Sequence, residues 1–323
     1  MQFRTPIEIT PSLWRISHQN VGLALGSCFS EAVACRLTDL RYPILNNPFG
    51  ALYNPLSIAH CLRRIVEGRE FEATELVEWR GRWFSLDAHT LLAADGPDEA
   101  LGRLNKALRE AHQTLCSADY VILTLGTNFV YETEGRVVAN CHRLPADRFV
   151  QRALSVTETV SALSEVVELL DDKRILLSVS PIRHLKDGLA ASSMSKAVLR
   201  VAADELASRF ERVTYFPAYE AVVDDLRDYR FYAPDMTHPS EQAVEYVWRL
   251  FEQAWLDPSE SELNDRIRRF VRACAHRPLD PQSADYREFV QNTLVECETL
   301  SQLLPSADFS SERALLLQKL SKK

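Results

Sequence analysis

The sequence lacks any long apolar run. Its opening stretch, MQFRTPIEITPSLWRISHQN, is interrupted by Pro6, Glu8 and Pro11, where a signal peptide would need unbroken apolar residues. No later segment approaches the roughly 18 consecutive apolar residues of a membrane-spanning helix. We therefore expect a cytoplasmic protein that does not associate with membranes.

Clusters of positive charge and paired cysteine motifs are also missing. The formal net charge is -8, and no group of Lys and Arg with interleaved aromatics forms the footprint of a nucleic-acid binder. The 7 cysteines include no CxxC pair, which argues against both a disulfide framework and a zinc site. We expect no nucleic-acid partner, no metal and no cofactor, with most cysteines packed as free thiols.

What is present is an alternation of β-rich runs and helical patterns, without internal repeats. The 323 residues, 46% of them hydrophobic, can bury a large core. Apolar runs at 21–25, 118–126 and 174–181 and a short run in VTYFPAYE predict strands. Helical patterns follow at 30–40, 55–68, 157–170, 192–210 and 240–256. This order predicts an α/β protein with a parallel sheet flanked by helices.

The composition changes near residue 257, where the β signal stops. We predict an α/β domain over 1–256 and a helical C-terminal extension over 257–323, serving as a lid or as a contact in a homo-oligomer. The stretch 70–100 resembles a loop-rich insertion. Within it, the spacing of Trp79 and Trp83 fits one face of a helix.

Polar residues follow three of the predicted strands or loops, and ligands of open parallel sheets bind at the carboxyl ends of strands. In APDMTHPS, Asp235 can hold one imidazole nitrogen of His238 while the other nitrogen faces a nucleophile. In GTN, Gly126 and Asn128 supply a backbone N–H and a side-chain amide suited to an oxyanion hole. Taken alone, GTN is equally typical of a turn, and the Asp235–His238 spacing is more typical of an ordinary exposed turn.

The stretch VGLALGSCFS places Ser27 and Cys28 where a helix begins. A thiol at a helix N-terminus near an imidazolium is expected to have a lowered pKa, which favours Cys28 as a nucleophile. Two alternatives remain. Ser27 is the nucleophile, presented by a slightly different turn between the strand and the helix, or Cys28 is a buried thiol that packs near Cys35.

Two further clusters carry candidate substrate-binding residues. NCHRLP contains His142, and SPIRHLKDG contains Arg183 and His184 after a predicted strand. These side chains can bind a carboxylate, a phosphate or a sugar hydroxyl of a small acyl or glycosyl substrate. A hydrogen-bond network that shapes the rim of the site is an equally good interpretation.

Several strings together resemble one bacterial family. GSCFS, NPFGALYNP, LTLGTNFVYE, ANCHRLP, SVSPIRHLKDG and YAPDMTHPS are similar to the GSCFA-domain family, which belongs with the SGNH or GDSL hydrolase-like proteins. The resemblance spans about residues 3–255. It implies a flavodoxin-like three-layer sandwich and a hydrolase site at the strand ends.

Aligned on the SGNH pattern, the resemblance implies a role for each motif. Cys28 takes the nucleophile position, where these hydrolases carry serine. Gly50 and Asn128 take the oxyanion-hole positions, and Asp235 with His238 forms the last block. Phe129 stands where an aspartate usually follows the asparagine. We predict a hydrolase or acyl transferase acting on an ester or thioester, the alternative being an inactive domain that binds an acylated or glycosyl ligand or a protein partner.

Overall fold

A parallel sheet forms the centre of the molecule, shown by a computed structural model that describes residues 4–170 and 172–321. Within these residues the sheet has 5 strands in the order β2-β1-β5-β9-β10. They are β1 Gly22–Gly26, β2 Ile44–Asn46, β5 Tyr120–Leu125, β9 Arg174–Val179 and β10 Val213–Phe216. The strand order reverses between β1 and β5, which is the flavodoxin-like pattern.

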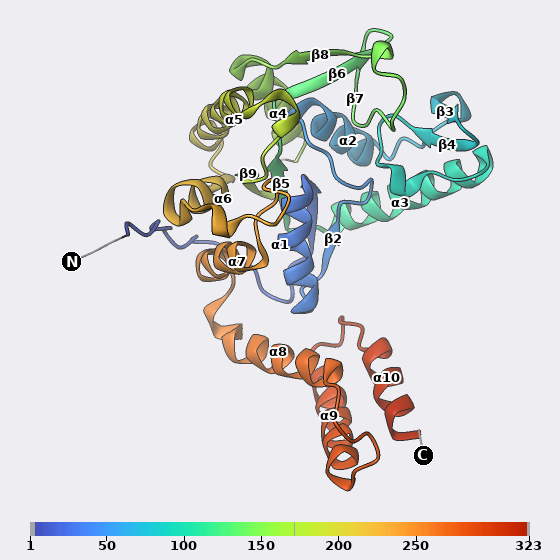
Figure 1. Ribbon diagram of the computed structural model, residues 1–323, viewed down its shortest axis with the longest axis vertical. Helices are drawn as coiled ribbons and strands as arrows, with labels where there is room; N and C mark the ends of the chain where they lie inside the picture. Colours follow the sequence, from blue (N-terminus) through green and yellow to red (C-terminus); the bar gives the residue numbers. More distant parts are fainter. Residues whose placement is uncertain (1–3, 171, 322–323) are drawn as a thin grey trace.

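Alternate residues of each strand enter two separate cores, one on each face of the sheet. In β1, Ala24 faces one core whereas Leu23 and Leu25 face the other. The helices α1 Cys28–Asp39 and α7 Glu241–Trp255 cover the first face. The second face is covered by α2 Pro55–Glu67, α3 Pro97–Ser117, α4 Val156–Leu169 and α5 Leu189–Arg209, so that in Figure 1 β5 and β9 of this sheet lie between α4 above and α7 below. The predicted three-layer α/β sandwich is confirmed.

Two small antiparallel sheets interrupt the α/β alternation. The hairpin of β3 Leu76–Trp79 and β4 Arg82–Ser85 shows that the helix predicted for Trp79 and Trp83 was wrong. Its turn residues Arg80 and Gly81 both have positive φ, 53° and 76°, as a type I′ turn requires. The second sheet consists of β6 Phe129–Thr133, β7 Arg136–Val138 and β8 Val150–Ala153.

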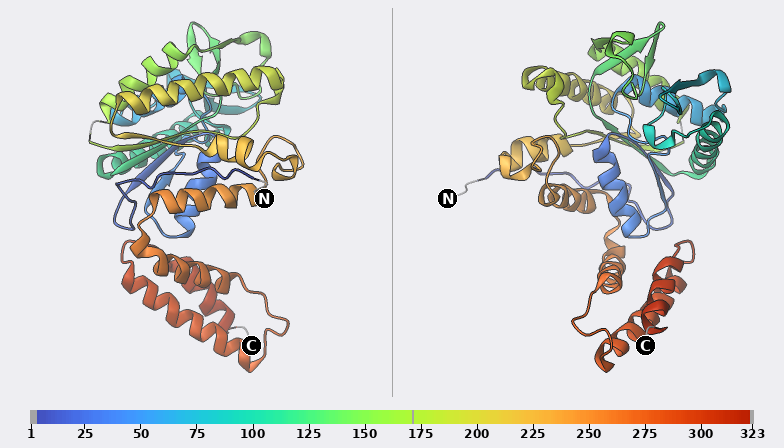
Figure 2. Two further views of the ribbon diagram at one scale, coloured as in Figure 1. Left: turned by 90° about the vertical axis from the view of Figure 1, so that its left-hand side faces the viewer. Right: turned by 45° about the vertical axis from the view of Figure 1, so that its right-hand side comes forward.

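The C-terminal extension contacts the end of α1 that is remote from Cys28. After α6 Ala218–Glu220, a π-helical segment Ala221–Leu226 and α7, the chain forms α8 Ser261–Ala275, α9 Ala284–Leu303 and α10 Ser310–Ser321 (Figure 2). Arg41, just beyond α1, forms an ion pair with Glu312 of α10. The predicted lid was therefore wrong, because these helices lie at the opposite end of the sheet from the cavity described below.

The remaining whole-chain expectations concern membranes and assembly. Among the residues described, no helix has both the length and the apolarity to cross a bilayer. The domain boundary at residue 257 and a homo-oligomer through the C-terminal helices stay predictions.

Candidate functional site

A cavity of about 620 Å³ opens at the carboxyl ends of β1, β5 and β9, and we call it the strand-end cavity. Loops from distant parts of the chain contribute its walls, which include Cys28, Tyr53, Phe129, Cys141, His184 and His238. This is the position at which open α/β sheets bind ligands, next to the reversal of strand order.

Ser27 and Cys28 have different environments although they are adjacent. Ser27 is 1% exposed, and its hydroxyl accepts the Phe29 N–H at 3.3 Å as the N-cap of α1. Cys28 is the first residue of α1, lines the strand-end cavity and lies with its Sγ 3.5 Å from the Tyr53 Oη. The sulfur, rather than the hydroxyl, faces the cavity.

Asp235 and His238 form a tight side-chain pair. The Asp235 carboxylate accepts the N–H groups of Thr237 and His238 at 2.9 and 3.0 Å, and its second oxygen lies 2.6 Å from His238 Nδ1. The backbone N–H of His238 and its imidazole lower the pKa of Asp235 to about 2. Because the carboxylate occupies Nδ1, the Nε2 atom of His238, a residue that lines the cavity with Cys28, is the nitrogen left for proton transfer.

The predicted oxyanion-hole residues lie beside the cavity, with their donors already bonded. Gly50 N–H donates to Asn47 O at 2.7 Å, and Gly126 N–H donates to Tyr53 O at 2.8 Å. The side-chain amide of Asn128 donates to Leu154 O at 2.7 Å. Gly50, Gly126 and Asn128 therefore support the loops around the cavity, and none of the three lines it.

Two other donors do reach the cavity wall. In the described chain, the Cys28 N–H has no hydrogen-bond acceptor, as expected at the first turn of a helix. Asn54 caps α2 through its Oδ1, which accepts Ser57 N–H at 2.8 Å, and its amide nitrogen has no acceptor within the described residues. Sequence reasoning missed Asn54, although the N-cap pattern Asn-Pro before a helix was a signal for it.

A buried lysine fixes the loops after the two central strands. Lys196 of α5 donates from Nζ to Gly126 O at 2.5 Å and to Ser180 O at 2.7 Å. Burial lowers its pKa to about 7. The sequence placed Lys196 on a helix but gave no signal that its ammonium group would cross to the strand ends.

The three predicted substrate-binding residues separate in the structure. Arg183 and His184 line the strand-end cavity. The His184 ring meets the Tyr53 ring edge-on with centroids 6.0 Å apart, and burial together with the Lys196 charge lowers its pKa to about 4. His142 does not line the cavity, and its ring nitrogens are bonded to Ser85 O at 2.8 Å and Thr90 Oγ1 at 3.1 Å.

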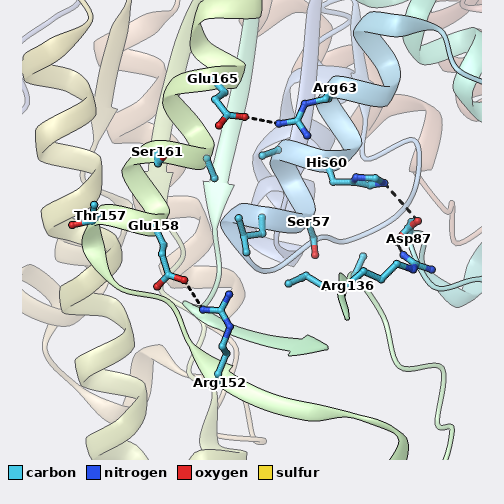
Figure 3. Close-up of a pocket in the computed structure, with 15 residues that line it drawn as sticks. Ser57, His60, Arg63, Asp87, Arg136, Arg152, Thr157, Glu158, Ser161 and Glu165 are labelled. Atoms are coloured by element: carbon cyan, nitrogen blue, oxygen red, sulfur yellow. Dashed lines mark hydrogen bonds and ion pairs between the residues drawn. The ribbon is translucent and has the colours of Figure 1, made fainter. Parts of the chain in front are cut away.

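A second cavity of about 630 Å³ lies between α2, α4 and the small β6–β8 sheet (Figure 3), and we call it the α2–α4 cavity. Its charged side chains pair with one another: Arg63 with Glu165 at 2.7 Å, Arg152 with Glu158 at 2.6 Å, and Arg136 with Asp87 at 2.7 Å. None of its lining residues directly follows a strand of the central sheet, and none is a cysteine. We therefore place the candidate chemistry in the strand-end cavity.

The fold and the cavity define an α/β protein with a thiol and an Asp–His pair at the carboxyl ends of a parallel sheet. The chain belongs to the GSCFA family, whose model matches residues 22–251, and a model of the GSCFA domain protein C-terminal domain matches residues 267–322. A search of curated proteins finds no match. In the described part of the chain, no group of three His, Cys, Asp or Glu side chains could hold a metal ion.

Proposed function

We propose that the protein is a hydrolase or acyl transferase that acts on an ester or thioester through Cys28. The observation that carries this proposal is the common cavity: Cys28 and His238 both line it, and Asp235 holds the far nitrogen of the imidazole. The resemblance to SGNH hydrolases supports the same roles for Cys28, His238 and Asp235.

The first half of the reaction transfers the acyl group to sulfur. His238 Nε2 takes the proton of the Cys28 thiol, and the sulfur attacks the acyl carbon. The negative charge on the resulting tetrahedral oxygen is stabilised by the Cys28 N–H and the Asn54 amide, which have no acceptor among the described residues. The bond to the leaving group breaks, and the imidazolium returns its proton to the leaving alcohol or thiol.

The second half releases the acyl group from the enzyme. Water or an acceptor alcohol gives its proton to His238 Nε2 and attacks the thioester carbon. The carbon–sulfur bond breaks, and Cys28 recovers its proton from the imidazolium. Asp235 stays ionised throughout and keeps the imidazole in one tautomer.

Cleavage of p-nitrophenyl butyrate and of a butyryl thioester tests the proposal. We expect Cys28→Ala and His238→Ala to lower kcat/KM by about 10²-fold or more. Ser27→Ala removes only a helix cap, so it should cost about 1 kcal/mol of folding free energy and leave kcat nearly unchanged. Cys141→Ala is the matched control, because Cys141 is a second thiol that lines the same cavity.

Two results would contradict the proposed role of Cys28. Loss of activity in Ser27→Ala with retention in Cys28→Ala would move the nucleophile to the hydroxyl. Equal, negligible cleavage by every variant, with slow alkylation of Cys28 at pH 7, would favour an inactive domain that binds an acylated or glycosyl ligand.

A further inference from the structure

The strand-end cavity carries an unbalanced set of charges. Arg143, Arg183 and Lys186 line it, with Asp187 as the carboxylate among its lining residues. In the described chain none of these three cations forms an ion pair, whereas each arginine of the α2–α4 cavity does. In a protein with a formal net charge of -8, a cationic cavity without paired carboxylates is suited to an anionic ligand.

The three cations differ in what holds them. The Arg183 guanidinium lies over Tyr232, with its central carbon 3.8 Å from the ring centroid. Lys186 donates to the Tyr131 hydroxyl at 2.8 Å. Arg143 is exposed and has no hydrogen-bond partner among the described residues. Arg143 is therefore the cation most available to a ligand.

The backbone that carries Arg143 is fixed in an uncommon conformation. His142 and Arg143 have φ values of 48° and 60°, in the left-handed region that residues other than glycine rarely adopt. The His142 ring stacks on Phe84 with centroids 4.1 Å apart and is hydrogen-bonded through both nitrogens. Such strain persists where the surroundings over-determine it. His142 thus positions Arg143 at the cavity.

Lys186 and Arg143 both line the cavity. The charge of Lys186 acts on the Cys141 thiol, where it opposes the rise in pKa caused by burial. Cys141 precedes Arg143 by two residues, and all three side chains line the cavity. An arginine fork and a lysine ammonium that line one cavity can share the oxygens of a phosphate.

Part of the lining is apolar. Phe129, Leu144, Phe149 and Ile182 line the same cavity as Cys28. A volume of about 620 Å³ lies within the usual range for a pocket that encloses a small organic ligand. The cavity therefore combines an apolar region for a hydrocarbon chain with a cationic region for a headgroup.

We propose that the strand-end cavity binds an acyl compound whose headgroup carries a phosphate, with Arg143 and Lys186 contacting the phosphate and the apolar residues contacting the acyl chain. As a substrate assignment this rests on the proposed function. The binding itself does not require Cys28 to react.

Calorimetric titration of the full chain with octyl phosphate, octanoate, 1-octanol and inorganic phosphate tests the binding. We expect octyl phosphate to bind at least about tenfold more tightly than each of the others, and its affinity to fall as salt is added. Arg143→Gln should weaken the affinity for octyl phosphate by about tenfold and leave the affinity for octanol unchanged. Arg63→Gln, which removes a paired arginine of the α2–α4 cavity, is the matched control and should leave the affinity unchanged.

Three results would overturn the proposal. Equal affinity for octanol and octyl phosphate would remove the role of the charge. Inorganic phosphate binding as tightly as octyl phosphate would remove the role of the apolar lining. An unchanged affinity in Arg143→Gln, or tighter binding of octanoate than of octyl phosphate, would show that the cavity does not select phosphate.

A kinetic arm separates this proposal from the proposed function. We expect octanoyl-coenzyme A, whose leaving thiol carries phosphates, to be cleaved with a lower KM than the octanoyl thioester of N-acetylcysteamine. Arg143→Gln should raise only the first KM, by about tenfold, with little change in kcat. Selective binding of octyl phosphate without turnover of either thioester would contradict the proposed enzyme activity and support the phosphate-bearing ligand class. Turnover of both thioesters with equal KM would support the proposed enzyme activity and contradict the phosphate-bearing ligand class.

Discussion

At the scale of single residues, the strongest prediction concerns Asp235. Its carboxylate accepts three hydrogen bonds from one short turn, and a pKa of about 2 keeps it ionised at neutral pH. We expect Asp235→Asn to lower kcat by about 10²–10⁴-fold, because an amide does not hold the Nδ1–H tautomer of His238.

The pH dependence of kcat/KM checks this assignment. The wild-type profile between pH 4 and 9 should show no step from Asp235, because its carboxyl titrates below that window. An Asp235→Asn variant with wild-type activity would remove Asp235 from the mechanism. Asp228→Asn is a suitable control, since Asp228 makes a similar pair with Arg230 outside the cavity.

His184 makes stability, rather than catalysis, depend on pH. Its folded-state pKa of about 4 lies below the unfolded value, so the unfolded chain takes up a proton first as the pH falls through about 6.5. The stability held at neutral pH is therefore lost between about pH 6.5 and 4. Between pH 7.5 and 5.0, urea denaturation should show wild type losing about 2 kcal/mol more than His184→Gln. Equal losses would contradict the buried, neutral imidazole.

The grouping of the motifs was easier to predict than the orientation of their donors. The motifs around Cys28, Asp235 and His238 are local in sequence, and their residues do line or adjoin one cavity. The donors of Gly50, Gly126 and Asn128 were beyond sequence reasoning, because backbone carbonyls from distant loops had already bonded them. The unpaired state of Arg143 likewise depends on which carboxylates the fold places near it.

At the scale of secondary-structure elements, Lys196 connects α5 to the loops after β5 and β9. Its two carbonyl acceptors would lose their partner in Lys196→Met, so we expect a loss of about 3 kcal/mol in the free energy of unfolding at pH 9. The variant also reports on the pKa of about 7. Because the folded pKa is lowered, wild-type stability should rise with pH between about 7 and 10.5.

Denaturation at pH 6 and pH 9 measures this coupling. The stability difference between wild type and Lys196→Met should be larger at pH 9 by about 3 kcal/mol. Lys106→Met on the exposed face of α3 is the control and should show no such change. A difference that stays the same between pH 6 and pH 9 would mean that the two carbonyls hold the ammonium charged.

Helices with clear caps were predictable, whereas short strands were not. Asn54 and Ser240 cap α2 and α7 at the predicted starts, and Gly68 ends α2 with a φ of 61°. The β3–β4 hairpin was missed because its Arg80–Gly81 turn differs from the usual Asn-Gly or Asp-Gly pair. β2, at Ile44–Asn46, is too short to show a period of two.

At the scale of the whole molecule, the α/β domain and the C-terminal helices share a buried polar junction. His18 contacts the Glu260 carboxylate through Nδ1 at 2.8 Å and through its backbone N–H at 3.1 Å. Tyr42 donates to the same carboxylate at 3.1 Å and stacks on the His18 ring with centroids 4.0 Å apart. This junction lies beyond the end of α1 that is remote from Cys28, so it can be altered without touching the strand-end cavity.

Glu260→Ala should therefore separate stability from activity. Removal of the Glu260 carboxylate leaves the His18 and Tyr42 donors without their acceptor, which should cost about 3 kcal/mol of unfolding free energy. The kcat/KM for an ester at 20 °C should stay within about twofold of wild type, because no residue of the C-terminal helices lines the cavity. Glu298→Ala, at an exposed position of α9, is the control for both measurements. A Glu260→Ala protein that is fully folded yet inactive would mean that the junction and the cavity are coupled through the sheet.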